Sequence, residues 1–329
     1  MAMMVMVNNL GSWKAVYPPL VHAEWNGLTP TDCIFPWFLF IMGVSMFYSL
    51  RKGGFTLSWK IPKRALALFG IGLVFNFIGK GIDGNWSLED LRYLGVLQRF
   101  GLCFGFTALL VCTVPHKWLG WIAAGILAAY SAILLLGNGY VQGADSILAQ
   151  VDKAVLGEGH IYEWGNGIDP EGVLSTLPAI AHTVIGFLVG TTLASKDMRK
   201  LDGAGILMLL GGFILMWALP INKKIWSPSF VLVTCGLGAL ILSLLHWLID
   251  ETHTLRHVAF WKTFGSNAIY CYIMAVILGW ILRLTDGRVL IMNTLGINEN
   301  TSLLFALCIV TLVWLLALPL YKRRIFIKL

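Results

Sequence analysis

Residues 302–321 read SLLFALCIVTLVWLLALPLY, which is twenty consecutive residues without a charged side chain. The hydrocarbon layer of a membrane is about 30 Å thick, and roughly 20 residues of α-helix cross it. Backbone groups in that layer must bond one another, and a continuous apolar run of this length does so as a helix. The alternating pattern that marks a membrane β-barrel is missing. The stretch therefore predicts a transmembrane α-helix.

Comparable apolar runs recur along the rest of the chain. Its 329 residues are 57% hydrophobic and 12% charged, with a mean hydropathy of +0.76, whereas charged residues make up about 25% of a typical soluble domain. The expected fold is all-α, a polytopic transmembrane helix bundle with about ten membrane segments in a single domain, 1–329. We place the segments at 1–10, 31–50, 62–79, 92–114, 118–137, 172–194, 203–220, 229–249, 264–284 and 302–321. The first is too short to span, and we expect it to be the outer half of a helix whose beginning is missing.

Charge and cysteine patterns exclude some classes of function. The formal net charge of +7 could suggest a nucleic-acid partner, but the basic residues gather in the loop 51–64 and at the C-terminus, beside predicted membrane segments. Clusters in such positions are topology signals first. The six cysteines lie within or beside apolar runs and lack metal-ligand spacing. The sequence contains no Gly-rich phosphate loop and no nucleophile elbow. We therefore predict no nucleic-acid partner and no metal site.

The basic loops also predict the orientation of the chain. Loops rich in Lys and Arg face the cytoplasm, which puts 51–61, 195–202 and the C-terminus on that side. The loop 138–171 contains six acidic residues against a single Lys153, and it then lies outside. The loop 11–30 lies outside as well. We expect an integral protein of a bacterial cytoplasmic (inner) membrane.

Lys223 and Lys224 are exceptions, because this orientation places both on the outer face. One explanation is snorkelling, since a long side chain at a helix end can carry its ammonium to the aqueous interface. The other is contact with an anionic or hydroxyl-rich ligand. The sequence leaves both explanations open.

The stretch His22-Ala-Glu-Trp-Asn-Gly-Leu-Thr-Pro-Thr-Asp32 precedes a predicted membrane helix. Thr29, Thr31 or Asp32 can cap that helix, because a side-chain oxygen satisfies a backbone N–H of the first turn. His22 is different, since an imidazole can act as base, acid or nucleophile near neutral pH. A carboxylate such as Asp32 could orient it and stabilise its cation. The spacing alone favours a structural histidine over a catalytic one, and it excludes neither.

Several polar residues fall at membrane depth or beside it. Gln98 and Arg99 lie inside a predicted span, where a charge is costly unless it faces a cavity or a partner. Asn8 and Asn9 end the first segment, and adjacent amides there could hold a carbonyl or hydroxyl group. Three milder cases could equally form structural hydrogen bonds between helices. They are Asn76, His182 and Asn267.

The stretch Asp169-Pro-Glu-Gly172 leads into a predicted helix from the outside. Its pattern is typical of a helix start, with Asp169 as N-cap, Pro170 at the first position and Glu171 in the first turn. The same carboxylates could instead contact a substrate. The local explanation accounts for the pattern without any catalytic role.

Taken in order, several blocks resemble the membrane-bound heparan-α-glucosaminide N-acetyltransferase family. Single blocks are weak signals, but the ordered set covers nearly the whole chain. The blocks are Val7-Asn-Asn-Leu-Gly-Ser-Trp13, His22 to Asp32 with Phe35-Pro-Trp-Phe38, Leu94-Gly-Val-Leu-Gln-Arg99, Asp169-Pro-Glu-Gly172 and Leu219-Pro-Ile-Asn-Lys-Lys-Ile-Trp-Ser227.

The resemblance implies an enzyme that transfers acetyl from cytoplasmic acetyl-CoA to the amine of a terminal glucosamine across the membrane. It places the active-site role on His22, with Asp32 beside it, and it is compatible with a homodimer in the lipid bilayer. We expect the cofactor-binding residues to be Asn8, Asn9, Gln98, Arg99, Asn76 and Asn267. We expect the substrate-binding residues to be Glu24, Trp25, Asn26, Asp169, Glu171 and Lys223.

The chain departs from the family pattern at its start. The family's first helix carries a Leu-Asp-x-x-Arg-Gly stretch before the asparagines, and this chain begins after it. The large lumenal domain of the animal enzymes is also absent, so the acceptor need not be polymeric heparan sulfate. Two other functions remain open. One is a transporter that moves an amino sugar without modifying it, and the other is a scaffold whose polar residues only join helices.

Overall fold

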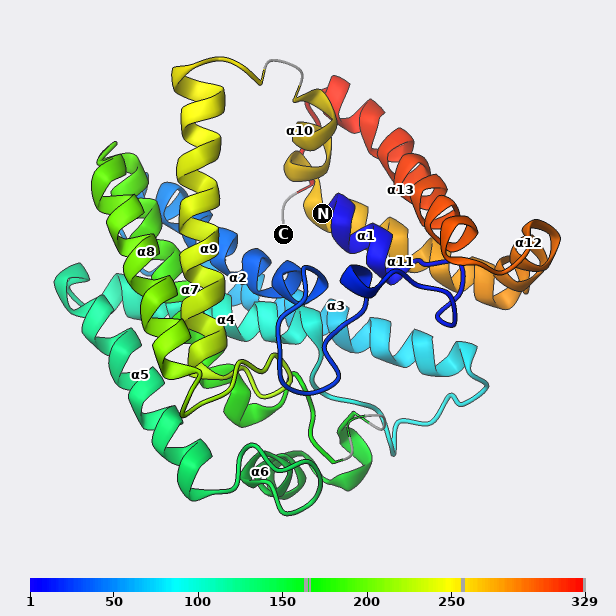
Figure 1. Cartoon of the computed structure of the whole chain (residues 1–329), viewed down its shortest axis with the longest axis horizontal. Helices are drawn as coiled ribbons and strands as arrows, with labels where there is room; N and C mark the ends of the chain where they lie inside the picture. The colour runs from blue at the N-terminus through cyan, green and yellow to red at the C-terminus, as the bar shows by residue number, and fades with distance from the viewer. Residues whose placement is uncertain (163–164, 166, 256–257, 328–329) are drawn as a thin grey trace. The chain divides into compact units, whose positions relative to one another are not determined.

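The computed structural model describes residues 1–162, 165, 167–255 and 258–327, and every regular element in these ranges is helical. Figure 1 shows the course of the chain. The α-helices are α1 (Ala2–Asn8), α2 (Ile34–Arg51), α3 (Lys60–Ile82), α4 (Val96–Thr113), α5 (His116–Leu136), α6 (Ile147–Leu156), α7 (Val173–Ala194), α8 (Met198–Leu215), α9 (Pro228–His246), α10 (Ala259–Ser266), α11 (Ala268–Leu284), α12 (Gly287–Leu295) and α13 (Glu299–Lys322). The predicted all-α class is confirmed.

Within the described residues, seven helices are long and apolar enough to cross a membrane, or eight if the bent pair α10–α11 forms one span. The polytopic membrane character is confirmed, but about ten segments were expected. Two predicted segments do not qualify. The segment 1–10 forms the seven-residue α1, and the segment 203–220 falls on α8, whose first turns carry Arg199, Lys200 and Asp202.

The predicted segment 264–284 is interrupted. α10 and α11 meet at an angle of 85°, with Asn267 between them in a non-helical conformation, φ −128° and ψ 47°. The Asn267 amide donates to the carbonyl of Ile325 and accepts from the N–H of Ile327. An asparagine side chain that bonds backbone in this way competes with helix continuation. The break is therefore fixed by the C-terminal segment.

The described residues divide into two compact units, which are described separately. Unit 2 comprises 24–28 and 35–247, and its core is centred on α7, which has 72% of its span buried. α2 approaches α7 closely, because a Cβ added at Gly43 or Gly186 would lie 2.1–2.2 Å from a carbonyl oxygen of the other helix. Such small-residue contacts are typical of membrane helix pairs. α8 and α9 run side by side in the same unit (Figure 1).

Unit 1 comprises 1–23, 29–34 and 248–329. In it, α1 packs against α13 and α11, and α13 also contacts α10. Its core gathers apolar side chains of these helices, among them Val5, Cys271, Phe305 and Val313. Unit 1 therefore holds α1 together with the helices that end the chain. The single-domain organisation stays a prediction.

Candidate active site

His22 and Asp32 lie together in unit 1, as the sequence predicted. His22 Nδ1 lies 2.7 Å from Asp32 Oδ1. The His22 side chain is 51% exposed, whereas that of Asp32 is 1% exposed. An accessible imidazole is thus held by a buried carboxylate, the arrangement that orients a general base.

Asp32 also organises the start of its own helical segment. Its Oδ2 accepts from the N–H of Thr29 at 3.1 Å, from Thr29 Oγ1 at 2.9 Å and from the N–H of Ala23 at 3.1 Å. In turn, the N–H of Asp32 donates a hydrogen bond to Thr29 Oγ1 at 3.3 Å. This exchange between positions three apart is the pattern of a capping box. The residue at the N-cap of the segment Thr31–Cys33 is Pro30, which makes no side-chain cap bond. The capping role of Thr29 or Asp32 therefore stays a prediction, while Thr31 Oγ1 donates to the carbonyl of Pro19.

The two oxygens of Asp32 therefore have different tasks. Oδ2 holds backbone and hydroxyl donors, and Oδ1 faces the imidazole. An ionised carboxylate only accepts hydrogen bonds, so the nitrogen facing it carries the proton. In neutral His22 this protonates Nδ1 and puts the lone pair on Nε2. His22 is thereby fixed in the tautomer that can take up a proton or attack a carbonyl.

The middle of the motif, Glu24 to Leu28, belongs to unit 2, where it pairs with the segment 219–227. Asn222 Nδ2 donates to Asn26 Oδ1 at 3.0 Å, and the N–H of Gly27 donates to the carbonyl of Ile221 at 2.8 Å. Lys224 donates to the carbonyl of Glu24 at 2.7 Å. Two blocks that are far apart in the sequence thus form one local structure.

Four candidate residues belong to these blocks, Glu24, Trp25, Asn26 and Lys223. The Trp25 indole N–H donates to the carbonyl of Tyr140, and the Lys224 ammonium lies 5.9 Å from the centre of the Trp25 ring. The Glu24 and Asn26 side chains are exposed, and Lys223 is half-buried. Lys224 therefore has a structural contact, and neither snorkelling nor a ligand is needed to explain it.

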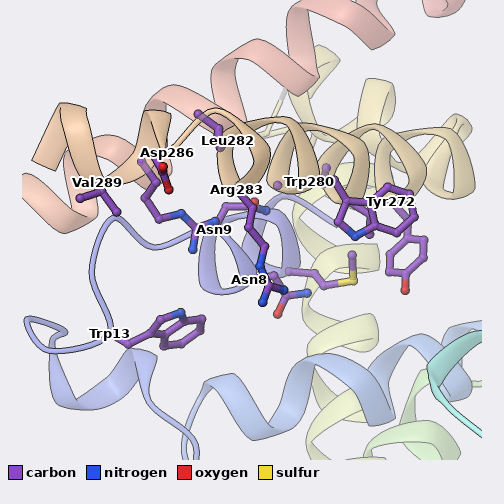
Figure 2. Close-up of a pocket in the computed structure, with 14 residues that line it drawn as sticks. Asn8, Asn9, Trp13, Tyr272, Trp280, Leu282, Arg283, Asp286 and Val289 are labelled. Carbon is purple, nitrogen blue, oxygen red and sulfur yellow. The ribbon is translucent and has the colours of Figure 1, made fainter. Parts of the chain in front are cut away.

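Asn8 and Asn9 line a cavity of about 480 Å³ within unit 1. Figure 2 shows the side chains of Asn8, Arg283 and Trp13 extending into it. Asn9 is buried, and its Nδ2 donates to the carbonyl of Val5 at 3.0 Å. Asn8 is exposed. The adjacent amides thus face an open space, as expected for residues that could hold a ligand.

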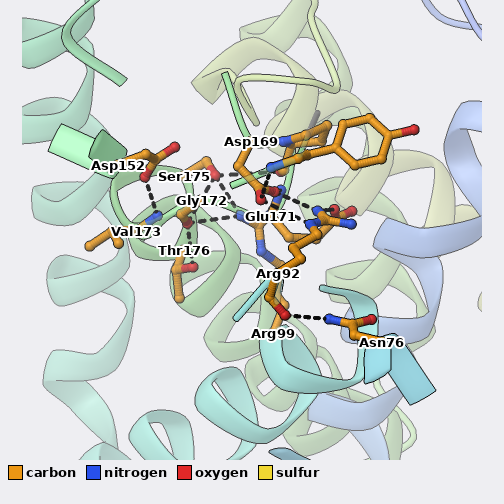
Figure 3. A network of polar contacts seen from close by, with 12 residues as sticks. Asn76, Arg92, Arg99, Asp152, Asp169, Glu171, Gly172, Val173, Ser175 and Thr176 are labelled. Atoms are coloured by element: carbon orange, nitrogen blue, oxygen red, sulfur yellow. Dashed lines mark hydrogen bonds and ion pairs between the residues drawn. The ribbon is translucent and has the colours of Figure 1, made fainter. Parts of the chain in front are cut away.

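Asp169 and Glu171 belong to a polar network in unit 2 (Figure 3). Arg92 binds Asp169 through Nε at 2.9 Å and Nη2 at 2.5 Å, and Nη2 also lies 2.6 Å from Glu171 Oε2. Asp169 is fully buried and accepts two further bonds from the N–H groups of Tyr162 and Glu171. Both of its oxygens therefore accept hydrogen bonds from donors of the protein itself.

Burial of Arg92 would by itself lower its pKa. The hydrogen bonds and charges of Asp169 and Glu171 outweigh that effect, so the pKa of the guanidinium lies above its ordinary value. Its Cζ also lies 4.6 Å from the centre of the Tyr162 ring, a cation–π contact. Arg92 therefore remains charged and neutralises the two carboxylates.

The start of α7 differs from the prediction. Gly172, not Asp169, is its N-cap, and Asp169 to Gly172 form a turn closed by a 2.9 Å hydrogen bond. Asp152 of α6 supplies the missing acceptor, because its Oδ1 binds the N–H of Val173 at 2.8 Å. The N-cap interpretation of Asp169 is wrong, since the carboxylate of Asp169 accepts hydrogen bonds from Arg92.

The candidates Gln98 and Arg99 are both buried on α4. Arg99 Nη2 donates to the carbonyl of Gly172 at 3.1 Å and to Ser175 Oγ. Its Cζ lies 5.1 Å from the centre of the Trp226 ring. Among the described residues, Gln98 Nε2 and Arg99 Nε and Nη1 have no hydrogen-bond partner. Buried donors of this kind are expected to meet an acceptor, which keeps both residues as cofactor candidates.

The other two amide candidates are tied to backbone. Asn76 Nδ2 donates to the carbonyl of Arg92 at 2.9 Å. Asn267 uses both ends of its amide on the C-terminal segment, as described above. These contacts give both residues a structural task. A role of either in cofactor binding stays a prediction.

Sequence reasoning missed Arg92 and Asp152. Arg92 lies two residues before the block that begins at Leu94, and an arginine at the start of the predicted span 92–114 was the available signal. Asp152 is one of six acidic residues in the loop 138–171, and nothing in the sequence distinguishes it from the others. Both bind residues at or just before the start of α7 that are distant from them in the sequence.

Replacing Arg92 by methionine is expected to destabilise the fold. The change leaves Asp169 and part of Glu171 buried without a counter-charge, and losing one partner of a buried pair costs about 3–5 kcal/mol. The unfolding midpoint of the detergent-solubilised variant, followed by tryptophan fluorescence, should fall well below that of the wild type. Arg199→Met, at an exposed position on α8, is the control. Equal midpoints for the two variants would contradict the assigned role.

Asp152 should make stability depend on pH. Burial raises the pKa of its carboxyl to about 6, although the bond from Val173 opposes the shift. The folded state therefore holds the proton more tightly than the unfolded state, and the free energy of unfolding should fall as pH rises from about 4 to about 6. In Asp152→Asn this component should vanish, while it should persist in Asp145→Asn at an exposed position. Unfolding midpoints measured from pH 4 to 7 test this, and an unchanged slope in Asp152→Asn would refute it.

Comparison with known proteins adds a second line of evidence. The heparan-alpha-glucosaminide N-acetyltransferase of Mus musculus is 27% identical over 411 aligned residues, covering 100% of this chain and 58% of the mouse protein. The Homo sapiens protein of the same name is 27% identical over 347 residues, covering 82% of this chain and 50% of the human protein. The chain is a distant relative of these N-acetyltransferases. This confirms the resemblance derived from the ordered motifs. No family model matches the chain, and the chain spans about half the length of the curated relatives.

Proposed function

We propose that the chain is a transmembrane N-acetyltransferase. It moves acetyl from acetyl-CoA on the cytoplasmic side to the amine of a glucosamine-type sugar on the outer face. The observation that carries the proposal is the pair of His22 Nδ1 and Asp32 Oδ1, 2.7 Å apart, with the imidazole accessible and the carboxylate buried. The names of the two relatives supply the class of reaction and of acceptor.

In the direct reaction, the amine nitrogen of the sugar bonds to the acetyl carbon, and the carbon–sulfur bond of the thioester breaks. The amine proton passes to His22 Nε2, and the departing thiolate can receive it back from the imidazolium. Asp32 stabilises the imidazolium while it carries that proton. An imidazole suits this task because it can accept a proton near neutral pH. The sugar amine must be unprotonated to attack.

In the alternative reaction, Nε2 itself attacks the thioester carbon and carries the acetyl group as an acyl-imidazole. The thiolate leaves, and the sugar amine then attacks the acetyl carbon. The bond from that carbon to Nε2 breaks, the amine proton passes to the thiolate, and neutral His22 is restored. Asp32 holds the same tautomer in both versions. Asn8 and Asn9 are our candidates for donors to the carbonyl oxygen, whose charge develops during attack.

The sidedness rests on charge distribution. Basic loops assign 51–61, 195–202 and the C-terminus to the cytoplasm, and the acidic loop 138–171 to the outside. This orientation brings the His22 loop to the outer face of a bacterial inner membrane. Acetyl would then cross through the protein to the acceptor.

Purified protein in liposomes, given radiolabelled acetyl-CoA on one side and glucosamine on the other, tests the proposal. Labelled N-acetylglucosamine should form on the acceptor side only when protein is present. Movement of glucosamine without acetylation would instead identify a transporter and refute the proposal.

Omission of the acceptor separates the two mechanisms. Label that accumulates on His22 and is discharged by added glucosamine would support the acetyl-carrier version. If the protein acquires no label without glucosamine, yet forms N-acetylglucosamine once glucosamine is added, the carrier version is excluded and His22 acts as a base.

A further inference from the structure

The cavity in unit 1 has features that the proposed reaction does not use. Its walls come from the C-terminal end of α1, the second half of α11 and the first turn of α12. Besides the asparagines, it is lined by Arg283, Arg288 and Asp286, and by the aromatic residues Trp13 and Trp280. Figure 2 shows these elements around it. The two arginines have no role in the acetyl-transfer scheme.

The charge of the cavity is positive. Arg283 and Arg288 contribute two guanidiniums against the single carboxylate of Asp286. Burial, and in addition the nearby charge of Arg283, lower the pKa of Arg288 below its ordinary value. Both guanidiniums belong to residues that line the same cavity, so their positive charges disfavour each other there. Within the described residues, Arg288 forms no ion pair. An anion between the arginines would relieve this repulsion.

The start of α12 adds to the positive potential. Its N-cap, Asp286, lies in the left-handed region with φ +50°, and its side chain does not cap the helix. Arg288 and Val289, both in the first turn, line the cavity. A helix N-terminus carries about half a positive charge and favours phosphate-type oxyanions. This terminus therefore acts in the same direction as the arginines.

Apolar side chains line the cavity together with the arginines, among them Trp280, Leu282 and Val289. Val289 is 56% exposed, and its neighbours in sequence on α11 and α12 include the exposed Leu284 and Leu290. Trp13, at the cavity, is 62% exposed. Guanidiniums beside exposed aliphatic and indole side chains match a molecule with an anionic head and apolar chains.

We propose that this cavity binds the phosphate of an anionic membrane phospholipid, with Arg283 and Arg288 on the phosphate and the apolar faces of α11 and α12 along the acyl chains. A small water-soluble phosphate shares the head-group chemistry but would not use those apolar faces. The proposal concerns lipid recognition by Arg283 and Arg288, which the acetyl-transfer scheme does not use, although Asn8 and Asn9 line the same cavity.

Native mass spectrometry of the full-length protein released from detergent micelles tests it. The probes are phosphatidylglycerol, phosphatidylcholine of the same acyl chains, and glycerol 3-phosphate. The wild type should retain phosphatidylglycerol in preference to phosphatidylcholine. The double variant Arg283→Gln/Arg288→Gln should bind phosphatidylglycerol about twenty-five-fold more weakly, because each arginine near an anionic head group contributes roughly a fivefold factor. Arg323→Gln, at an exposed position of the same unit, should bind normally.

Three results would overturn the proposal. The first is equal retention of phosphatidylglycerol by the wild type and the double variant. The second is equal retention of the two lipids. The third is binding of glycerol 3-phosphate as tight as that of phosphatidylglycerol and equally dependent on the arginines, which would identify a soluble phosphate ligand. Arg288→Lys keeps the charge without the planar fork and should bind with intermediate affinity, so a general folding defect is distinguishable from loss of the site.

Discussion

His22→Ala is expected to abolish measurable transfer of acetyl to glucosamine. Without the imidazole, the amine proton has no acceptor in the direct reaction, and the acyl-imidazole cannot form in the stepwise one. Loss of a general base alone lowers the rate by about a hundredfold to ten-thousandfold, and loss of an acetyl carrier removes the pathway. The measurement is the initial rate of N-acetylglucosamine formation in liposomes.

The fold should survive this substitution, because half of the His22 side chain is exposed and truncation at an exposed site usually costs little stability. An unchanged unfolding midpoint would separate lost chemistry from lost structure. His253→Ala, which removes an exposed histidine from the same unit, should keep full activity. Full activity in His22→Ala would refute the catalytic assignment.

Asp32→Asn is expected to lower the rate by about a hundredfold to ten-thousandfold. The amide can place its oxygen toward Thr29 and Ala23, in which case its NH₂ faces His22 Nδ1. The imidazole must then accept at Nδ1 and hold its proton on Nε2, which is the wrong tautomer for a base. Turned the other way, the NH₂ meets backbone N–H groups that need an acceptor. In neither orientation can the amide replace both acceptor oxygens of the aspartate.

The same assay measures this effect, and the pH profile distinguishes it from a general loss of structure. A variant that is merely misfolded loses activity equally at every pH, whereas loss of the carboxylate should shift the pH dependence that His22 imposes on the rate. Asp145→Asn, which removes an exposed carboxylate, should leave rate and profile unchanged. A wild-type rate in Asp32→Asn would show that the carboxylate does not orient His22.

The sequence was most informative where the cause is local. Apolar runs predicted the spans, since a helix that crosses a membrane is specified by its own side chains. The prediction that Thr29, Thr31 or Asp32 caps a helix was of the same local kind, because side-chain oxygens at a helix start lie near its first N–H groups. His22 lies only ten positions from Asp32, and the pairing could be anticipated although its geometry could not.

Features that depend on distant residues were not predictable. The break between α10 and α11 is fixed by backbone groups of Ile325 and Ile327, about sixty residues later. Asp169 lost its expected capping role because Arg92, 77 positions away, holds its carboxylate. Local propensity cannot reveal such partners, since they are brought together only by tertiary packing.

The double use of Asp32 has an evolutionary consequence. One carboxylate ends the loop, starts the helix and fixes the imidazole, so mutation cannot explore these properties independently. Glutamine would be acceptable at the third position of a capping box that had no other task, yet its amide cannot hold His22 in the same tautomer. The substitutions tolerated at Asp32 are therefore limited by two unrelated requirements at once. Those tolerated at Thr29, which bonds the same carboxylate, are limited in part by the same requirements.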